Sequence, residues 1–525
     1  MSEQAFRLTY ATMYNPPDFL HTRYDEEVAK LRANLGQEYG MIINGEERLS
    51  KEKFTSTNPA DTEQVLGVFQ KGTAQDALDA IAAARAQAKS WGRTPWQERV
   101  AIMRKAASNI DERIFEFGAV ISMEAGKNRM EALGDASEIA DLIRYACDQV
   151  EENDGFVVKM GKDPLVGYDA TNYSVLRPYG VWVIIAPFNF PGALLGAPAG
   201  AALVAGNTIV MKPATDTPFT GRLIAECFRD AGLPAGAFNF VTGPGRSVGQ
   251  TLIDSDDVDG ITFTGSYDVG MKIYRTYASG KYPRPTILEM GGKNPAIVTK
   301  NADLDRAAAG LIRSAFGLQG QKCSAASRIY IEEPVYDELV GRLKEATDKL
   351  VVGEPTDQGT FMGPVINKWA YQDFKDFNEE LSQAGTFLSG GKVLTEGDYA
   401  KGYFCQPTLA IDVPLEHRLW KHEMFLPIAM IHKVDSLETA MELANDVDYG
   451  LTAGIYGNKD EVQYFFENIE AGVNYANRPQ GATTGAWPGF QPFGGWKGSG
   501  SSGKNAGGKY YVQLYMHEQS RTVIE

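Results

Sequence analysis

The chain has 525 residues, of which 43 % are hydrophobic and 22 % charged, with 55 glycines and a formal net charge of −16. This length predicts two or three domains, and the acidic balance argues against nucleic acid or an anionic membrane as the main partner. The four cysteines form no CxxC pair and the five histidines form no HExxH motif. Neither a disulfide scaffold nor a metal centre is therefore expected.

The first forty residues, with PPDF and a charged helix, are typical of an arm rather than a domain. Their start, MSEQAFRLTYATMYNPP, lacks the basic and apolar regions of a signal peptide. From about residue 41 onward, helix and strand patterns alternate, which predicts a parallel α/β fold. The predicted helices are 76–90, 97–109, 217–230, 304–316 and 336–349, and the predicted strands include 238–242, 261–263, NPAIVTK and SRIYIEE.

A stretch without any charged residue covers 181–211 and is long enough on paper to span a bilayer. Prolines and glycines interrupt it repeatedly. Because buried parallel strands read as continuous apolar runs, we interpret it as a strand (GVWVIIAP), a loop, a helix of small residues (GALLGAPAGAALVAG) and a strand (NTIVMKP). We expect no membrane insertion and a cytoplasmic location.

Near the end, the segment FGGWKGSGSSGKNAGGK is too rich in glycine to be a core element. It leads into an alternating pattern, YYVQLYMHEQSRTVI, which predicts a strand. A terminal strand of this kind often pairs with another sheet edge, so we expect it to contribute to a homo-oligomer.

Two segments about thirty residues apart carry the chemistry, LEMGGKNP with Glu289 and GQKCSAASR with Cys323. A single cysteine is more often buried filler than a nucleophile, but small neighbours leave room for a substrate, and Lys322 brings positive charge that favours the thiolate. Cys147, Cys227 and Cys405 lie in apolar patterns and are interpreted as structural. A cysteine with a separate carboxylate suits covalent capture of an aldehyde, followed by hydrolysis of a thioester.

Two glycine patterns compete as the site of a cofactor phosphate. In ITFTGSYDVG, a strand is followed by Gly265, Ser266 and a helix start, where backbone N–H groups attract phosphate; a serine helix cap is the alternative. In VTGPGRSVG the spacing departs by one residue from a dinucleotide fingerprint, which favours a tight turn. Lys212, at a strand end, would bond ribose hydroxyls or be a solvated lysine.

The motifs APFNFP, KPA, FTGS, LEMGGKNP, GQKCSA and HEMFLP occur in the order seen in the NAD(P)-dependent aldehyde dehydrogenase superfamily, and the resemblance spans nearly the whole chain from about residue 42. It implies an α/β fold with a Rossmann-type cofactor domain, an α/β catalytic domain bearing Cys323 and a small β oligomerisation domain. The implied boundaries are 1–40 for the arm, 41–155 and 178–288 for the NAD(P)-binding domain, 289–494 for the catalytic domain, and 156–177 and 495–525 for oligomerisation segments.

The resemblance also implies NAD as the cofactor, with NADP as the alternative. Thr215 stands where strongly NAD-selective relatives place a glutamate that repels the 2′-phosphate of NADP. Glu423 would bind the nicotinamide ribose, and Phe425 would pack against the nicotinamide. The full set implied for the cofactor is Ile185, Pro187, Lys212, Thr215, Gly265, Ser266, Gly270, Glu423 and Phe425.

In the implied mechanism, Cys323 attacks the aldehyde and gives a thiohemiacetal that can expel hydride. Asn189 resembles the family asparagine whose side-chain amide holds the oxyanion with the Cys323 backbone N–H; a turn residue between two aromatics is its alternative. Glu289 would act as the general base for thioester hydrolysis, or else form a salt bridge with Lys293. Members that pass the acyl group to coenzyme A lack this glutamate, so a free acid is expected.

The segment TTGAWPGFQPFGG resembles the glycine-rich loop of the branch that oxidises glutamate γ-semialdehyde (1-pyrroline-5-carboxylate) to glutamate in proline degradation. The α-carboxylate would be held by the N–H groups of Gly485 and Ala486 and the Ser324 hydroxyl, and Phe493 would pack the aliphatic stem. Glu138 would lie near the substrate ammonium, or on a solvated helix face. Ala486-Trp487-Pro488 replaces smaller residues, which leaves the pocket shape open.

Two alternatives remain beside this hypothesis. The substrate could be another semialdehyde with a carboxylate, such as succinic or aminoadipic semialdehyde. The chain could be a non-catalytic binding or structural protein on this scaffold, although Asn189, Glu289 and Cys323 argue against that. We expect no fused flavin domain, and a separate proline dehydrogenase is the candidate partner.

Overall fold

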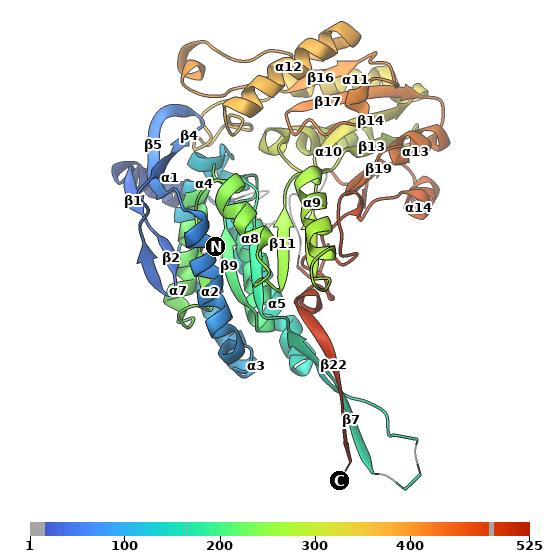
Figure 1. Cartoon of the computed structure of the whole chain (residues 1–525). Helices are drawn as coiled ribbons and strands as arrows, with labels where there is room; N and C mark the ends of the chain where they lie inside the picture. The colour runs from blue at the N-terminus through green and yellow to red at the C-terminus, as the bar shows by residue number, and fades with distance from the viewer. Residues whose placement is uncertain (1–15, 165, 168, 482–487, 525) are drawn as a thin grey trace.

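The computed structural model describes residues 16–164, 166–167, 169–481 and 488–524. Two seven-stranded sheets form the body, and a three-stranded ribbon projects from it (Figure 1). The predicted α/β architecture is therefore confirmed. Within the described part of the chain, no helix is both long enough and apolar enough to cross a membrane.

The first sheet contains five parallel strands in its centre and at one edge. Its order is β12-β11-β8-β9-β10-β2-β3. The strands are β8 (Val181–Ile185), β9 (Thr208–Lys212), β10 (Phe238–Phe240), β11 (Gly260–Thr264) and β12 (Thr286–Glu289), with β2 (Met41–Ile43) and β3 (Glu46–Arg48) antiparallel at the other edge. The chain runs from β8 outward to β10 and then returns to β11 on the other side of β8. Such a reversal leaves a crevice at the carboxyl ends of β8 and β11, where open parallel sheets bind ligands.

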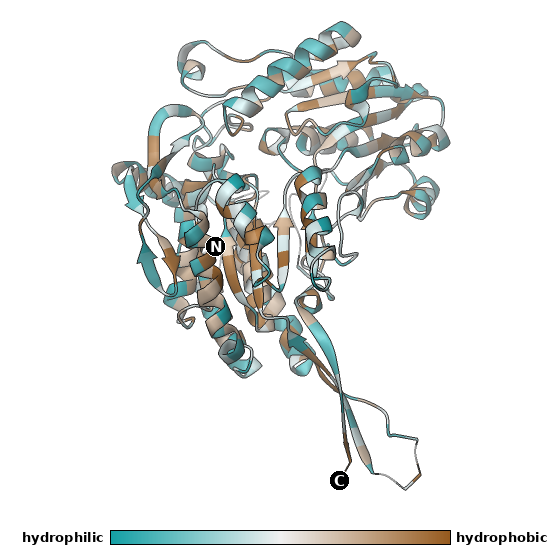
Figure 2. Ribbon diagram, in the orientation of Figure 1, coloured by the Kyte–Doolittle hydropathy of each residue, from teal (hydrophilic) through white to brown (hydrophobic). Residues whose placement is uncertain are grey.

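Helices cover both faces of this sheet. They are α2 (Ala74–Trp91), α3 (Trp96–Glu112), α4 (Ile114–Ala125), α5 (Arg129–Glu152), α6 (Ala193–Ala205), α7 (Pro218–Ala231), α8 (Gln250–Asp254) and α9 (Tyr267–Ala278). The predicted helices 76–90, 97–109 and 217–230 correspond to α2, α3 and α7. In Figure 2 the central strands are largely brown, whereas the helices in front of them show both teal and brown.

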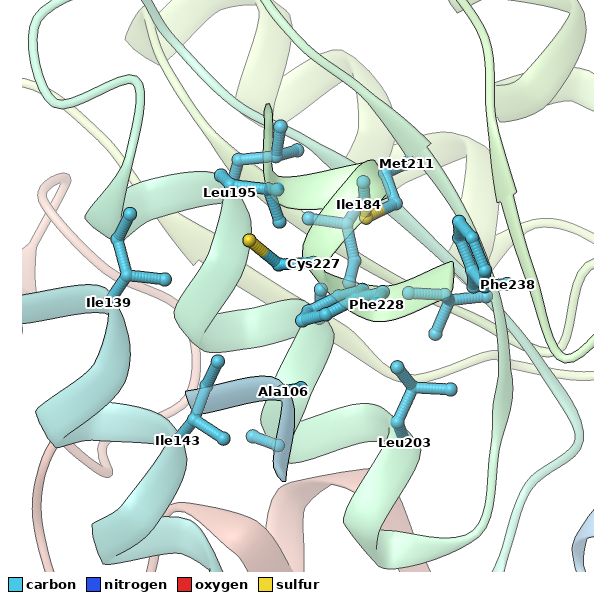
Figure 3. Close-up of a cluster of buried hydrophobic side chains, with 14 of the residues drawn as sticks. Ala106, Ile139, Ile143, Ile184, Leu195, Leu203, Met211, Cys227, Phe228 and Phe238 are labelled. Carbon is cyan, nitrogen blue, oxygen red and sulfur yellow. The ribbon is translucent and has the colours of Figure 1, made fainter. Parts of the chain in front are cut away.

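The uncharged stretch 181–211 forms β8, α6 and β9, as predicted. Its small residues let α6 lie directly against α5. A Cβ atom on Gly196 would lie 2.4 Å from Ile139 Cγ2, and one on Gly200 would lie 2.5 Å from Ile143 Cγ1. Figure 3 shows these two isoleucines facing α6 in the buried cluster. Glycine is therefore required by the close approach of the two helices.

The predicted arm is packed against the body over its described part. Helix α1 (Asp18–Ala33) buries Leu20, Tyr24 and Val28 against α4 and α5. Strand β1 (Gln37–Tyr39) pairs with β5 (Asp61–Gln70), which also pairs with β4 (Lys53–Asn58).

The second sheet has the order β15-β16-β17-β14-β13-β19-β20. Its strands are β13 (Asn294–Val298), β14 (Ala326–Glu332), β15 (Thr386–Ser389), β16 (Thr408–Ile411), β17 (Ile428–Val434), β19 (Thr452–Tyr456) and β20 (Val473–Ala476), of which only β15 is antiparallel. The helices are α10 (Leu304–Phe316), α11 (Glu333–Asp348), α12 (Lys368–Ala384), α13 (Leu437–Asn445) and α14 (Lys459–Asn468). Residues 290–293 connect β12 to β13, so the carboxyl edge of the first sheet meets the amino edge of the second.

The projecting ribbon consists of β6 (Val157–Lys159), β7 (Ala170–Pro178) and β22 (Met516–Ile524), and β22 pairs antiparallel with β7 of the same chain. A second small pair joins β18 (Tyr449–Gly450) and β21 (Trp496–Lys497). The predicted terminal strand was too long at its start, because 512–515 form a 3₁₀ turn. Tyr511, Val512 and Tyr515 pack into the core of the first sheet, which an extended strand would not allow.

Removing Phe228 should destabilise the first core. Phe228 is fully buried on α7, and its ring lies 6.1 Å from that of Phe238 in an edge-to-face arrangement. We expect Phe228→Ala to lower the free energy of unfolding by about 3–5 kcal/mol, measured by urea denaturation. Phe466→Ala, on the exposed face of α14, is the matched control, with an expected loss below about 1 kcal/mol. Equal losses for both variants would contradict this description of the core.

Candidate active site

Cys323 and Glu289 line the same cavity, between the two sheets. The cavity has a volume of about 990 Å³, and Glu138, Ser324 and Phe493 line it as well. The structure thus brings together five residues that the sequence had placed in one site. A second, more polar cavity of about 1110 Å³ adjoins it and shares Glu138 and Phe190 with it.

The peptide that carries Cys323 is held by a buried asparagine that sequence analysis did not identify. The Asn294 side-chain amide donates to the carbonyl oxygens of Cys323 at 2.6 Å and of Ala325 at 2.9 Å. Its Oδ1 accepts the backbone N–H of Thr452 at 2.9 Å. The signal that sequence analysis could have used is the position of this asparagine between Lys293 and a proline, at the start of a predicted strand. Asn294 therefore fixes the nucleophile to both β13 and β19.

Burial and neighbouring carboxylates keep Cys323 in its thiol form. Burial raises the pKa of the Cys323 thiol to about 12, with smaller contributions from Glu423 and Glu289, while the N–H groups of residues 323 and 324 oppose the rise. The positive charge of Lys322 interacts with Cys323, but it does not offset the rise that burial causes in the pKa of the thiol. The Lys322 Nζ donates to the Arg313 carbonyl at 3.4 Å, and burial lowers the pKa of Lys322, with Glu131 opposing that shift. Cys147, Cys227 and Cys405 are buried, as predicted.

Glu289 has the environment of a general base. Burial raises the pKa of its carboxyl well above the ordinary value, against a hydrogen bond from the Gly495 backbone. A raised carboxyl pKa lies closer to neutral pH, where proton transfer is most efficient. Among the described residues, neither Glu289 Oε2 nor Lys293 Nζ has a hydrogen-bond partner, so the alternative salt bridge between them is absent.

Two glycines allow the connection 290–293 to pass between Glu423 and the Cys323 peptide. A Cβ atom on Gly291 would lie 2.1 Å from Glu423 Oε2, and one on Gly292 would lie 2.4 Å from the Cys323 carbonyl oxygen. The Gly292 N–H donates to Glu423 Oε1 at 2.8 Å. Burial raises the pKa of Glu423 to about 7, although the Gly292 N–H and Lys293 oppose the rise. A side chain at Gly291 would displace the Glu423 carboxylate, and one at Gly292 would meet the Cys323 backbone.

Two further side chains hold the same connection from outside. Ser499 Oγ donates to the Gly291 carbonyl at 2.6 Å, and Arg328 Nε donates to the Lys293 carbonyl at 2.8 Å. Arg328 also donates to the carbonyls of Leu443 and Ala444 at the end of α13. The connection is thus tied to the C-terminal segment and to the second sheet.

Asn189 lies on the loop between β8 and α6, and it is 2 % exposed. Its neighbour Phe190 lines both cavities, whereas Asn189 is not among the lining residues, so the oxyanion role stays a prediction. This loop is held by a buried ion pair that sequence analysis missed. Lys127 Nζ lies 2.9 Å from Asp135 and 3.7 Å from the Phe190 ring centre, and Asp135 accepts the N–H of Ala193 at 2.7 Å.

Several residues expected to bind the cofactor lie at the carboxyl edge of the first sheet. Ile185 and Lys212 end β8 and β9, while Gly265 and Ser266 follow β11. Ser266 precedes α9 but makes no side-chain capping bond, so its exposed hydroxyl is not used as a helix cap. Lys212 is 4 % exposed, and its Nζ donates to the Pro213 carbonyl at 3.1 Å. Burial lowers the pKa of Lys212 to about 8, which excludes a solvated lysine.

The remaining residues expected to bind the cofactor have varied surroundings. Pro187 is partly exposed beside Phe188, whose ring meets that of Phe425 edge-on at 5.9 Å. Gly270 is buried, and a Cβ atom there would lie 2.5 Å from Met290 Sδ, so it serves packing. Thr215 is exposed.

The second glycine pattern, VTGPGRSVG, does not form the tight turn that its spacing suggested. Gly245–Gly249 makes a π-helical turn that continues into α8, after β10. The segment therefore follows the order of a strand and then a helix, because the residues expected to form a turn begin a helix instead of reversing the chain.

On the substrate side, Glu138 is 9 % exposed and lines both cavities, so the alternative of a solvated helix face is wrong. Burial raises the pKa of Glu138 well above its ordinary value; Asp135 adds to the rise and Lys127 opposes it. Gly485, Ala486 and Trp487 lie outside the described residues.

Comparison with known proteins agrees with this geometry. The model of the aldehyde dehydrogenase family matches residues 46–521. A 1-pyrroline-5-carboxylate dehydrogenase of Geobacillus sp. (strain WCH70) is 39 % identical over 508 residues, which cover 96 % of each chain. The chain belongs to the aldehyde dehydrogenase family.

Solved structures show the same likeness. The 1-pyrroline-5-carboxylate dehydrogenase from Thermus with bound NAD is 33 % identical, with full coverage of both chains and a TM-score of 0.92. Proline utilization A from Bdellovibrio bacteriovorus is 34 % identical with a TM-score of 0.90; the match covers 96 % of this chain but only 51 % of that one. This chain thus spans about half the length of the larger protein.

The raised pKa of Cys323 predicts how fast the thiol is alkylated. Because the thiolate is the reactive form and the pKa is about 12, the thiolate fraction should grow about tenfold for each pH unit below that value. We expect the rate of iodoacetamide labelling of cofactor-free protein to rise in this way from pH 7 to 10, measured by intact mass. Cys323→Ala should remain unlabelled on this timescale. A plateau below pH 9 would contradict the raised pKa.

Proposed function

We propose that this chain is an NAD-dependent dehydrogenase that oxidises glutamate γ-semialdehyde, the open form of 1-pyrroline-5-carboxylate, to glutamate in proline degradation. The single observation that carries the proposal is that Cys323, Glu289, Glu138, Ser324 and Phe493 line one cavity. The relatives with the same overall fold are named for this reaction.

The cofactor fits the crevice at the carboxyl edge of the first sheet. The buried amine of Lys212 and the exposed, uncapped hydroxyl of Ser266 are donors suited to ribose hydroxyls and phosphate oxygens. When bound, NAD supplies the acceptor for the substrate hydride. Thr215 brings no negative charge against a 2′-phosphate, so NADP is the alternative cofactor. Glu423 and Phe425 would hold the nicotinamide end.

The residues of the chain divide the remaining chemistry. Cys323 loses its proton and attacks the aldehyde carbon, and the oxyanion is held by the Cys323 backbone N–H and the Asn189 amide. Loss of hydride leaves a thioester on Cys323. Glu289 then accepts a proton from water as the water attacks the acyl carbon, and the carbon–sulfur bond breaks to release the acid.

Recognition of the substrate follows from its two charges. The N–H groups of Gly485 and Ala486 and the Ser324 hydroxyl would hold the α-carboxylate, Phe493 would cover the aliphatic stem, and Glu138 would face the ammonium. A cation beside the buried Glu138 would draw its carboxyl into the charged form. A semialdehyde without an ammonium gains nothing from this group.

We propose that the chain forms a homo-oligomer. The ribbon of β6, β7 and β22 leaves sheet edges exposed, which suits a homo-oligomer. A separate proline dehydrogenase would supply the substrate, since the larger protein from Bdellovibrio is named for proline utilization. We propose a cytoplasmic location for the chain.

Two variants test the catalytic roles separately. Cys323→Ala should abolish NADH formation from 1-pyrroline-5-carboxylate. Glu289→Gln should slow the steady state by about 10²–10⁴-fold while still giving a single turnover, after which intact mass should show an acyl group on Cys323. Cys147→Ala, at a buried cysteine outside the cavity, is the matched control. Native activity in Cys323→Ala would refute the proposed function.

A panel of semialdehydes tests the substrate. We expect kcat/KM to be highest for 1-pyrroline-5-carboxylate, above that for succinic and aminoadipic semialdehyde. Glu138→Gln should lower kcat/KM for 1-pyrroline-5-carboxylate by about 10–100-fold, because a charged hydrogen bond is lost, and should leave that for succinic semialdehyde nearly unchanged. Equal wild-type efficiency for 1-pyrroline-5-carboxylate and succinic semialdehyde would favour the alternative substrate class.

A further inference from the structure

A chain of buried hydrogen-bonding groups leads to the cavity that contains Glu289. Trp182 Nε1 donates to Thr262 Oγ1 at 2.9 Å, and Thr262 Oγ1 donates to the Tyr515 hydroxyl at 3.2 Å. The Tyr515 hydroxyl donates to that of Tyr511 at 2.9 Å. Each group thus uses its hydrogen on the next, and Tyr511 is the last member.

Tyr511, the last residue of this series, lies at the wall of the cavity. Tyr511 is 8 % exposed and lines the cavity together with Cys323 and Glu289. Its own hydrogen is donated to no described residue. Apolar side chains form much of the cavity wall, with Leu142, Ala146, Leu194, Ala197 and Val512 among them. A water molecule in the cavity would need one of its polar lining groups to hold it.

The pairing of β11 with β12 places two threonines of β11 near Glu289. Strands β11 and β12 are parallel, and Thr264 pairs with Glu289. Thr262 lies two residues earlier, on the same face of β11 as Thr264, and both line the cavity. Burial raises the pKa of Tyr511 and Tyr515, and the charge of Glu289 adds to both shifts, so the carboxylate is within electrostatic reach of the hydroxyls.

Glu289 offers the matching acceptor. Its Oε2 is buried and makes no hydrogen bond within the described chain. A water between the two groups would donate to Glu289 and accept from Tyr511, which fixes two of its four hydrogen-bonding directions. The remaining lone pair is then free to attack a carbonyl carbon.

We propose that Tyr511 is a positioning residue for thioester hydrolysis, which holds the attacking water against Glu289 by donating its hydroxyl hydrogen to the water oxygen. This inference deepens the proposed function and rests on it. The water oxygen bonds to the acyl carbon, Glu289 accepts the water proton, and the carbon–sulfur bond breaks with its electron pair returning to Cys323 Sγ. The carboxylic acid leaves, and Tyr511 keeps its own proton.

The other members of the chain set the direction of that hydroxyl. Tyr515 is fully buried, and its ring meets the ring of Trp182 at 4.8 Å and that of Tyr511 edge-on at 5.5 Å. Since Tyr515 occupies one lone pair of the Tyr511 oxygen, the Tyr511 hydrogen points elsewhere. Tyr515 thus acts through Tyr511 and does not touch the water.

The test separates hydrolysis from hydride transfer with p-nitrophenyl acetate, which acylates the Cys323 thiol directly. For Tyr511→Phe we expect an unchanged burst of nitrophenolate, followed by deacylation slowed about tenfold, the effect of one lost hydrogen bond. Adding hydroxylamine to the acylated enzyme gives the hydroxamate. The ratio of hydroxamate to acetate should rise by the same factor, because this stronger nucleophile needs no positioned water.

Tyr24→Phe is the matched control, because Tyr24 is a fully buried tyrosine whose hydroxyl bonds Ser122 at 2.6 Å in the α1 cluster. It should keep the wild-type deacylation rate and partition ratio. Tyr515→Phe should shift both in the direction of Tyr511→Phe by a smaller factor, and it decides the matter if Tyr511→Phe does not fold by circular dichroism.

Wild-type deacylation and an unchanged partition ratio in both tyrosine variants would overturn the inference. The proposed function fails on a different result, namely wild-type protein that acylates Cys323 with the ester but forms no NADH from 1-pyrroline-5-carboxylate. The two failures are therefore distinguishable.

Discussion

The connection of four residues between β12 and β13 is the constraint on which the site depends. Glu289 ends one sheet and Asn294 begins the other, so Glu289 and the residue that holds the Cys323 peptide are only five positions apart in the chain. Gly291 and Gly292 make the passage narrow enough for Glu423 and the Cys323 carbonyl to contact it. The way the two sheets are joined therefore determines where Glu289 and Cys323 lie relative to each other.

Burial then decides the charge state of those groups. The thiol, the base and the carboxyl of Glu423 all have raised pKa values in the absence of ligands. The thiol is therefore largely protonated at neutral pH, and both carboxyls hold their protons to a higher pH than ordinary carboxyls do. The raised pKa protects Cys323 from side reactions, since the thiol is less nucleophilic than the thiolate.

The sequence motifs identified residues that the fold brings into one cavity, because glycine, cysteine and glutamate at fixed spacing leave a local signature. The residues that hold the site in place have no such signature in the sequence. Asn294 bonds Thr452, and Tyr515 bonds Thr262, only after distant segments have packed together. The charge of Lys322 could be read from the sequence, but the depth of burial that outweighs its effect on the pKa of Cys323 could not. Helices with strong periodicity, such as α10, were predicted to the residue.

The packing of Tyr511, Val512 and Tyr515 into the first core has a consequence for biosynthesis. The strands of that core emerge from the ribosome early, but its final wall is made from residues near position 515. Strand β7 likewise pairs with β22, which is synthesised more than three hundred residues later. The first sheet therefore cannot reach its finished state during translation, and a nascent chain stalled before this point would expose an unfilled apolar groove to chaperones.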